Sequence, residues 1–150
     1  MDEPTTPTLT SNPVSQQPSV TSSAEPKAAT GKKVLIIEDD VFIRDLYEMQ
    51  AKKMGYQVIT ADNGEEGINK AKANPPDLLL TDLMLPKLDG ISIVKMFKSD
   101  PTLSKTSCLI ITNLEDATKE KEALAVGASA YILKIKNTPS KVVEMFKNYI

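Results

Sequence analysis

Short apolar segments alternate with longer segments of helical periodicity along most of this chain. Five of the short segments are apolar almost throughout, at residues 34–37, 58–60, 78–80, 109–111 and 131–133. Strands that are buried on both faces of a parallel sheet have this continuous apolar character, whereas strands with one wet face alternate polar and apolar residues. We therefore interpret the five segments as strands of a parallel sheet.

The segments between these strands have the spacing and the end signals of helices. The first one repeats apolar residues three or four positions apart, at Ile43, Leu46, Tyr47, Ala51 and Met54. Gly55 then stands where a glycine ends a helix, and Gly127 does so for the fourth segment. The Asn-Pro-Pro sequence at residues 74–76 stops the second segment, Asp89 begins the third, and Pro139 suits the first turn of the last. The last helix places apolar residues at Val142, Val143, Phe146 and Tyr149.

Five consecutive strand–helix units predict an α/β fold. Crossovers between parallel strands are right-handed and place helices on both faces of the sheet. The predicted architecture is a three-layer α/β/α sandwich around a five-stranded parallel sheet. Helices on both faces also explain why the strands lack polar alternation.

The first 30 of the 150 residues differ in composition from the rest. They contain five Pro, six Thr and five Ser, and all four Tyr and three Phe residues of the chain follow Gly31. A segment of this kind buries too little apolar surface to offset the conformational entropy that it would lose on ordering. We predict a disordered tail over residues 1–31 and one globular domain over residues 32–150.

Charge and cysteine content exclude several classes of protein. A net charge of −2 gives no strong field for nucleic acid or a membrane surface, and no apolar run reaches the roughly 20 residues that cross a bilayer. The single cysteine, Cys108, and the lack of histidine exclude a disulfide framework, the usual zinc sites and histidine-based triads. The N-terminus lacks the features of a signal peptide. We expect a cytoplasmic protein that neither inserts into a membrane nor binds nucleic acid directly.

Acidic residues follow two of the predicted strands, at the edge of the sheet where open α/β folds carry their functional crevice. Glu38, Asp39 and Asp40 follow the first strand, and Asp82 follows the third. If these two strands are neighbours, about 4.8 Å apart, Glu38, Asp39 and Asp82 converge. Their repulsion favours a bound proton or a cation, and oxygen-only ligands near solvent suit Mg²⁺ or Mn²⁺. We assign Asp40 to capping the helix that follows.

Two further polar residues end strands at the same edge. Thr112 follows the fourth strand and Lys134 the fifth, and beside three acids we expect the lysine to form an ion pair. A carboxylate nucleophile, metal-binding acids, a hydroxyl donor and an ammonium are the groups that move a phosphoryl group onto an aspartate, here Asp82. Because the acyl phosphate that results is labile, this modification suits signalling.

The chain resembles the receiver domains of two-component response regulators, and the resemblance covers about residues 32–150 through four motifs in the family's order. Residues 34–40, Val-Leu-Ile-Ile-Glu-Asp-Asp, resemble the first strand with its acidic pair. Residues 82–90, Asp-Leu-Met-Leu-Pro-Lys-Leu-Asp-Gly, resemble the phosphoacceptor loop. Residues 110–112 and 128–134 resemble the fourth and fifth strands with their switch and lysine positions. The resemblance implies the flavodoxin-like strand order 2-1-3-4-5.

The resemblance also implies a role for each acidic residue of the crevice. Asp82 would accept a phosphoryl group from a histidine kinase or a histidine phosphotransfer protein. Mg²⁺ would be bound directly by Asp39, partly through water by Glu38, by Asp82 itself, and by the backbone carbonyl of Met84.

Three residues correspond to the family's phosphoryl-contact and switch positions. Lys134 would contact the phosphoryl group. Thr112 and Tyr131 resemble the switch pair, in which the hydroxyl moves toward the phosphate and the aromatic ring turns inward. The implied function is a phosphorylation-dependent switch that changes its affinity for a partner protein and catalyses only its own phosphoryl transfer and dephosphorylation. Because the chain stops at Ile150, we expect a stand-alone receiver without an output domain, like the chemotaxis regulators.

The sequence departs from the family pattern at several positions around the crevice. Ile135 replaces the proline, commonly cis, that usually follows the lysine. Since a cis bond before a residue other than proline costs about 2.5–4 kcal/mol, we expect a trans bond and an altered loop. Asn113 stands where a small residue is common. Met84 and Leu114 occupy positions that tune hydrolysis, and because both are apolar they cannot orient an attacking water, so we expect slow self-dephosphorylation.

Three other classes of protein compete with this interpretation. An aspartyl phosphatase of the haloacid dehalogenase type needs a second aspartate two residues beyond the nucleophile, where this chain has Met84. A flavin- or nucleotide-binding module needs a loop of Gly, Ser or Thr around phosphate, and the acids at residues 38–40 would repel one. A receiver that has lost phosphorylation and serves as a scaffold ranks second to the phosphorylated receiver, because its only support is Ile135 in place of proline.

Overall fold

The computed structural model of the chain describes residues 29–150. The tail that we predict over residues 1–31 lies almost wholly outside the described residues, so that division of the chain stays a prediction. Within the described residues no helix has the length and apolar character that crossing a bilayer requires.

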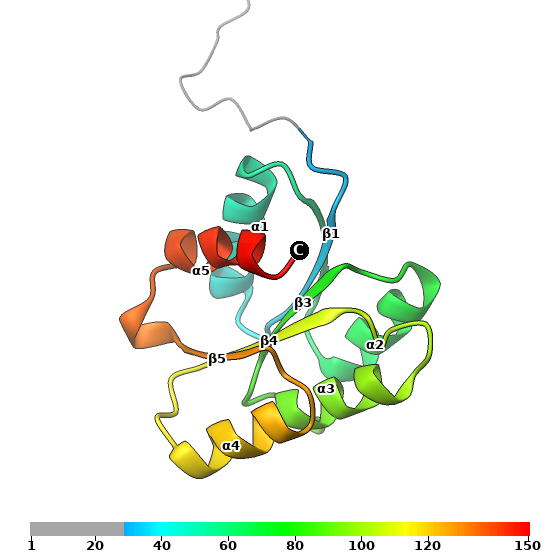
Figure 1. Cartoon of the computed structure of the whole chain (residues 1–150). Coiled ribbons are helices and arrows are strands. Elements are labelled where there is room, and N and C mark those ends of the chain that lie inside the picture. Colours follow the sequence, from blue (N-terminus) through cyan, green and yellow to red (C-terminus); the bar gives the residue numbers. More distant parts are fainter. Residues whose placement is uncertain (1–28) are drawn as a thin grey trace, which may run out of the picture.

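Five parallel strands form one sheet in the order β2-β1-β3-β4-β5, and Figure 1 labels four of them, β1, β3, β4 and β5. Their bounds are β1 Lys33–Ile37, β2 Gln57–Ala61, β3 Leu78–Asp82, β4 Ser107–Thr112 and β5 Ala130–Leu133. The structure confirms the parallel sheet and the strand order 2-1-3-4-5. Because β1 lies between β2 and β3, the chain changes direction across the sheet at β1, and the crevice of such a fold opens at this point.

Five α-helices cover the two faces of the sheet. They are α1 Val41–Lys53, α2 Gly64–Ala73, α3 Gly90–Ser99, α4 Ala117–Ala125 and α5 Pro139–Met145, with 3₁₀ turns η1 Lys134–Lys136 and η2 Phe146–Asn148. Helices α1 and α5 lie together on one face, and α2, α3 and α4 lie side by side on the other (Figure 1). The predicted three-layer α/β/α sandwich is confirmed.

Each face of the sheet has its own hydrophobic core. Leu35 and Ile37 of β1 point toward α2 and α3, while Val34 and Ile36 point toward α1 and α5. All four side chains are buried, and burying a side chain of this size contributes about 2 kcal/mol. Successive side chains of the strand therefore point into one hydrophobic core and then into the other. Because both cores are apolar, the strand is a continuous apolar run in the sequence.

The predicted helix ends agree with the structure. The Asp40 side chain caps α1 by accepting hydrogen bonds from the backbone N–H groups of residues 42 and 43, and the Asp89 side chain caps α3 by accepting one from the backbone N–H of Ser92. Gly55 and Gly127 follow α1 and α4 with φ angles of 94° and 113°, which glycine adopts without the steric cost of a Cβ atom. Pro139 occupies the first turn of α5.

The apolar spacing leaves one detail of α1 open, and one detail of the last helix differs from the prediction. Leu46, which shares the apolar spacing of α1, is 44% exposed, because Tyr47 and Ala51 define the buried face of the helix. The last α-helix ends at Met145 and tightens into a 3₁₀ turn at Phe146, so Tyr149 lies beyond the helix. The helical period alone does not distinguish the buried side of such a stripe from its neighbour.

Candidate functional site

Three carboxylates meet at the carboxyl ends of β1 and β3. Glu38 and Asp39 follow β1, and Asp82 is the last residue of β3, the neighbouring strand. One carboxylate oxygen from each of the three lies within 4.8 Å of the others. The convergence that we expect from the strand ends is therefore present in the structure.

The three acids differ sharply in their surroundings. Glu38 and Asp82 are only 2% and 6% exposed, whereas Asp39 is exposed. The Asp39 carboxylate accepts no hydrogen bond from residues 29–150, while the Glu38 carboxylate accepts one from the Asp40 backbone N–H at 3.2 Å. Asp39 is thus the carboxylate that is free to bind something from solvent.

Lys134 supplies the positive charge of this cluster. Its Nζ atom donates to Glu38 Oε2 and to Asp82 Oδ2, each at 2.8 Å, so the predicted ion pair is present. Burial alone would lower the pKa of the lysine, but its hydrogen bonds and charge interactions with the two carboxylates outweigh burial and raise the pKa. The ammonium therefore stays charged at neutral pH.

Glu38 does not share this preference for the charged form. Burial raises its pKa from 4.5 to about 7, and the nearby charge of Asp82 acts in the same direction, against the hydrogen bond from Lys134. Burial of the carboxyl group therefore outweighs the stabilisation of its charged form by Lys134. A proton at Glu38 or a cation beside it relieves the remaining repulsion.

The loop after β3 is built closely around Asp82. The Met84 backbone N–H donates to Asp82 Oδ1 at 3.3 Å, and the Gly90 backbone N–H donates to the carbonyl of Leu83 at 2.9 Å. A Cβ atom on Gly90 would lie 2.5 Å from the Asp82 carbonyl oxygen, so only glycine fits there. Lys87, in the same loop, has a φ of 69°, a conformation that costs energy for any residue with a Cβ atom.

The side chains of the two predicted switch residues bond the same loop residue, Leu114. The Thr112 hydroxyl accepts a hydrogen bond from the Leu114 backbone N–H at 3.0 Å, and the Tyr131 hydroxyl donates to the Leu114 carbonyl at 2.7 Å. The ring of Tyr131 packs at the margin of the core beneath α2, α3 and α4. Thr112 is buried and forms no hydrogen bond with the acids in this structure. Its role and that of Tyr131 stay predictions.

The segment after Lys134 follows the expectation of a trans bond. No peptide bond within residues 29–150 is cis, and η1 begins at Lys134 and leaves Ile135 71% exposed. The Met84 side chain is also exposed. The role of its backbone carbonyl as a metal ligand stays a prediction.

One residue at the site has no counterpart in the sequence-based predictions. Arg44, in the second turn of α1, donates from Nη1 to the backbone carbonyl of Glu38 at 2.8 Å. Helical spacing does not reveal such a contact, because the side chain reaches back to the strand end that precedes its own helix. The available signal is composition, since Arg44 is the only arginine of the chain.

The donor set fits a small hard cation. It offers only carboxylate oxygens, those of Asp39 are free, and the three acids outnumber the one lysine that bonds the cluster. Mg²⁺ and Mn²⁺ prefer oxygen ligands and keep several waters, which an open rim beside Asp39 allows.

Comparison with known proteins agrees with this geometry. The sequence profile described as "Response regulator receiver domain" matches residues 34–147. The chain belongs to this family. Receiver domains are signalling modules of two-component systems; they generally use Mg²⁺ and interact with histidine kinases and with downstream partners. The haloacid dehalogenase and flavin-binding alternatives are thereby set aside.

Relatives and solved structures show how widely this domain is used. The polar-differentiation response regulator DivK of Brucella anthropi is 30% identical over 79% of this chain and 96% of its own length. The transcriptional regulatory protein PhoP of Bacillus subtilis is 36% identical over 69% of this chain but 42% of its own length. The chemotaxis response regulator CheY4 of Vibrio cholerae superposes with a TM-score of 0.73 at 27% identity, covering 79% of this chain and 98% of that chain.

The curated relatives are in most cases longer than the matching region. The chain spans 40% of the length of a probable transcriptional regulator of Guillardia theta and 14% of the gliding motility regulatory protein of Myxococcus xanthus. The shared unit is therefore the receiver domain, and the outputs of these relatives do not transfer to this chain.

Proposed function

We propose that this receiver accepts a phosphoryl group on Asp82 from a phosphohistidine donor, with Mg²⁺ bound by Glu38, Asp39, Asp82 and the backbone carbonyl of Met84. The observation that carries the proposal is the cluster of three carboxylates within 4.8 Å with Lys134 bonded to two of them. Bound Mg²⁺ would lower the charge repulsion between these acids and an incoming phosphoryl group. The proposed cellular setting is the cytoplasm.

The chain's own groups account for the transfer. A carboxylate oxygen of Asp82 forms a bond to phosphorus as the phosphorus–nitrogen bond of the donor breaks, and the imidazole nitrogen keeps the electron pair and takes up a proton. Lys134 already bonds Asp82 at 2.8 Å, so its ammonium lies within reach of the phosphoryl oxygens. The product is an acyl phosphate, which water hydrolyses.

The contacts at Leu114 support a switch that follows the transfer. Thr112 bonds its N–H and Tyr131 bonds its carbonyl. A Thr112 hydroxyl that turned toward a phosphoryl group would give up the first bond, and Tyr131 alone would then hold Leu114. Phosphorylation would thereby shift the loop between β4 and α4 and change the affinity for a partner protein.

The exposed face of α1 suits the docking of a helical phosphodonor. Phe42, Leu46 and Met49 are 80%, 44% and 54% exposed and stand four and three residues apart, so they form one apolar stripe. The stripe begins beside the acidic cluster, where a donor protein must lie to bring its histidine to Asp82. Apolar stripes of this spacing pack against helices.

A groove of about 410 Å³ continues the stripe toward the loop after β5. Leu46 and Ile135 line it together with Lys136 and Lys141, and no acidic residue does. The partner face that fits is therefore helical and apolar, with acidic side chains at the margin that meet the lysines. A histidine kinase or a histidine phosphotransfer protein is the proposed occupant.

The function that we propose is that of a signalling switch and not of an enzyme with a separate substrate. Catalysis by the chain is then limited to its own phosphoryl transfer and dephosphorylation. Met84 and Leu114 present apolar side chains near the site, which supports slow hydrolysis. We also infer that the receiver begins near residue 32, because β1 starts at Lys33, with residues 1–31 as a separate tail.

Intact-mass analysis after treatment with acetyl phosphate tests the phosphoacceptor. We expect a gain of one phosphoryl group that requires Mg²⁺, is lost on mild base treatment, and is absent in Asp82→Asn. Asp89→Asn, which changes a helix cap and not the acidic cluster, serves as the control and should still gain the group. Full labelling of Asp82→Asn would contradict the assignment, and no labelling of the wild-type protein would favour a scaffold.

A separate experiment tests docking at the apolar stripe of Phe42, Leu46 and Met49. Its probe is a histidine phosphotransfer protein that phosphorylates the wild-type receiver. Phe42→Ser should slow transfer from that protein at least tenfold while labelling by acetyl phosphate stays unchanged, because only the protein donor needs the stripe. Met96→Ser removes an exposed apolar side chain from α3 instead and should leave both rates unchanged. Equal slowing with both donors would contradict docking at α1.

A further inference from the structure

Arg44 holds the chain on both sides of Asp39. Its backbone N–H donates to the carbonyl of Asp40 at 2.9 Å, as the helix requires, and its guanidinium donates to the carbonyl of Glu38 at 2.8 Å. The guanidinium therefore bonds the peptide group that joins Glu38 to Asp39. That one peptide lies between the buried carboxylate and the free carboxylate of the cluster.

The backbone carbonyl of Glu38 lies just beyond the point where strand pairing stops providing hydrogen-bond donors. The Glu38 backbone N–H still donates to Ala61 of β2 at 3.1 Å, but the pairing of β1 with β3 ends at Ile37 and Thr81. A backbone carbonyl in a poorly solvated position needs a donor. Arg44 is that donor, and the planar, permanently charged guanidinium holds its geometry better than a lysine ammonium on a flexible chain does.

The remaining contacts show why this peptide matters for ligand geometry. The Glu38 carboxylate is held by Lys134 and by the Asp40 N–H, and Asp40 is held as the helix cap. The Asp39 carboxylate has no partner in the described chain, so the backbone, which sets the direction of the Cα–Cβ bond, is the part of the chain that aims this side chain. A rotation of the peptide between residues 38 and 39 would turn it away from Asp82.

Arg44 does not act as a counter-ion in this arrangement. Within residues 29–150 its guanidinium forms no ion pair, and the group that it bonds is a backbone carbonyl. Positioning and charge compensation also predict opposite effects. A positive charge near the cluster opposes cation binding, so its removal alone would tighten the binding of a divalent ion.

We propose that Arg44 is a positioning residue of the cation site, which fixes the peptide between Glu38 and Asp39 and thereby aims the Asp39 carboxylate. The inference rests on the proposed function, since it requires that these acids bind a divalent cation. Groups that orient metal ligands typically contribute about tenfold to a hundredfold to metal affinity.

The direct test is Mn²⁺ binding to the unphosphorylated protein, measured by the electron paramagnetic resonance signal of the free ion. Arg44→Met should raise the Kd for Mn²⁺ about tenfold. Arg44→Lys, which keeps the charge and one donor, should recover part of this loss. Lys52→Met removes the same charge from the same helix, where Lys52 pairs only with Glu48. It should leave the Kd unchanged or slightly lower.

The possible results distinguish a failure of the proposed cation site from a failure of the proposed role of Arg44. A wild-type protein that binds no Mn²⁺ would overturn the proposed cation site itself. Binding by the wild type with an equal or lower Kd for Arg44→Met would overturn positioning and favour a charge effect. Circular dichroism confirms that each variant is folded at the temperature of the titration. If Arg44→Met does not fold, the Kd of Arg44→Lys decides, and a value equal to that of the wild type overturns the proposal.

Discussion

The two edges of the sheet differ in what their charged side chains bond. At the carboxyl edge, Lys134 bonds the side chains of Glu38 and Asp82, and the Asp39 carboxylate is left without a partner in the described chain. At the amino edge, polar side chains bond the backbone. Asp77 accepts from the Lys33 N–H at 2.8 Å.

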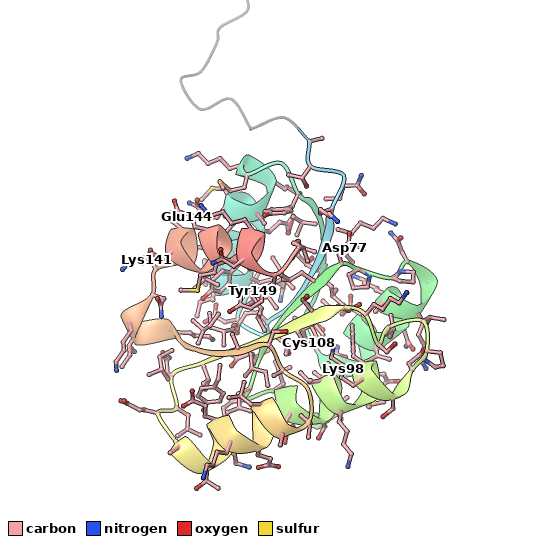
Figure 2. The ribbon with its side chains drawn as sticks, viewed as in Figure 1. Asp77, Lys98, Cys108, Lys141, Glu144 and Tyr149 are labelled. Carbon is pink, nitrogen blue, oxygen red and sulfur yellow. The ribbon has the colours of Figure 1, made fainter. Side chains whose placement is uncertain are left out.

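The amino edge continues this pattern along β4 and α3, and Figure 2 labels three of the residues involved, Asp77, Lys98 and Tyr149. The Thr106 hydroxyl donates to the carbonyl of Pro76 at 2.7 Å, and the Ser107 hydroxyl donates to the carbonyl of Tyr149 at 3.0 Å. Lys98 donates from Nζ to the carbonyl of Thr106 at 2.7 Å. These bonds satisfy backbone groups where strands begin, and they stabilise the fold without leaving a reactive group.

This difference between the two edges shows that the destabilising features of the fold lie at the carboxyl edge. Like charges, a free carboxylate and the strained φ of Lys87 all lie at the carboxyl edge, and such features persist only where the surrounding structure enforces them. The amino edge and the two cores supply that support. Substitutions at the carboxyl edge should therefore change stability and ligand binding together, whereas those at the amino edge should change stability alone.

The largest expected effect is that of Lys134→Met. It leaves Glu38 and Asp82 buried without their counter-charge, so the free energy of unfolding should fall by about 3 kcal/mol at pH 8. Urea unfolding measures this fall, which should shrink at pH 5.5 because Glu38 then takes up a proton. Lys141→Met, at an exposed lysine of α5 (Figure 2), is the control. A similar loss in both variants would mean that the buried charges are not the cause.

The pH dependence of stability should report Glu38 directly. Its folded pKa of about 7 lies above the ordinary 4.5, so between these values the folded protein binds a proton that the unfolded chain does not. In metal-free buffer the free energy of unfolding should therefore rise as pH falls from 7 toward 4.5, by about 1.4 kcal/mol per pH unit at most. Glu38→Gln should lose this slope, and an unchanged slope would assign it to another group.

Thr106→Val tests the opposite edge with a smaller expected effect. The substitution keeps the shape of a buried side chain but leaves the Pro76 carbonyl without its donor, which should cost about 1–2 kcal/mol in urea unfolding. Phosphorylation by acetyl phosphate, measured by intact mass, should be unchanged. A loss of phosphorylation in a folded Thr106→Val protein would break the separation of the two edges.

Lys87→Gly should have the smallest effect and the opposite sign. Glycine adopts the φ of 69° without steric cost, so the substitution should stabilise the protein by about 0.5 kcal/mol after the greater entropy of the unfolded glycine is included. Thermal unfolding followed by circular dichroism measures the shift. Lys95→Gly, in the middle of α3, should instead destabilise, by about 1 kcal/mol. Destabilisation in both would show that Lys87 is not strained.

Much of the carboxyl edge was predictable from the chain itself. The carboxyl ends of parallel strands lie at one edge of the sheet. Once the alternation of strands and helices is recognised, the acids at the ends of β1 and β3 and the lysine after β5 are therefore predicted to lie near one another. Helix caps such as Asp40 and Asp89 were predictable because a cap bonds its own next turn. The exposure of the Leu46 side chain was not predictable, because helical spacing does not distinguish two adjacent apolar faces.

The order of apolar and polar residues by itself determined the strands, the helices, the sandwich and the edge that holds Glu38, Asp39, Asp82 and Lys134, because these follow from local periods and chain connectivity. Only the tertiary structure decided the distances and charges within that edge. The pKa of Glu38 near 7 depends on burial by neighbouring segments, and the bond from Arg44 depends on how α1 returns toward β1. Solvation and side-chain reach are properties of the packed molecule, and no spacing along the chain encodes them.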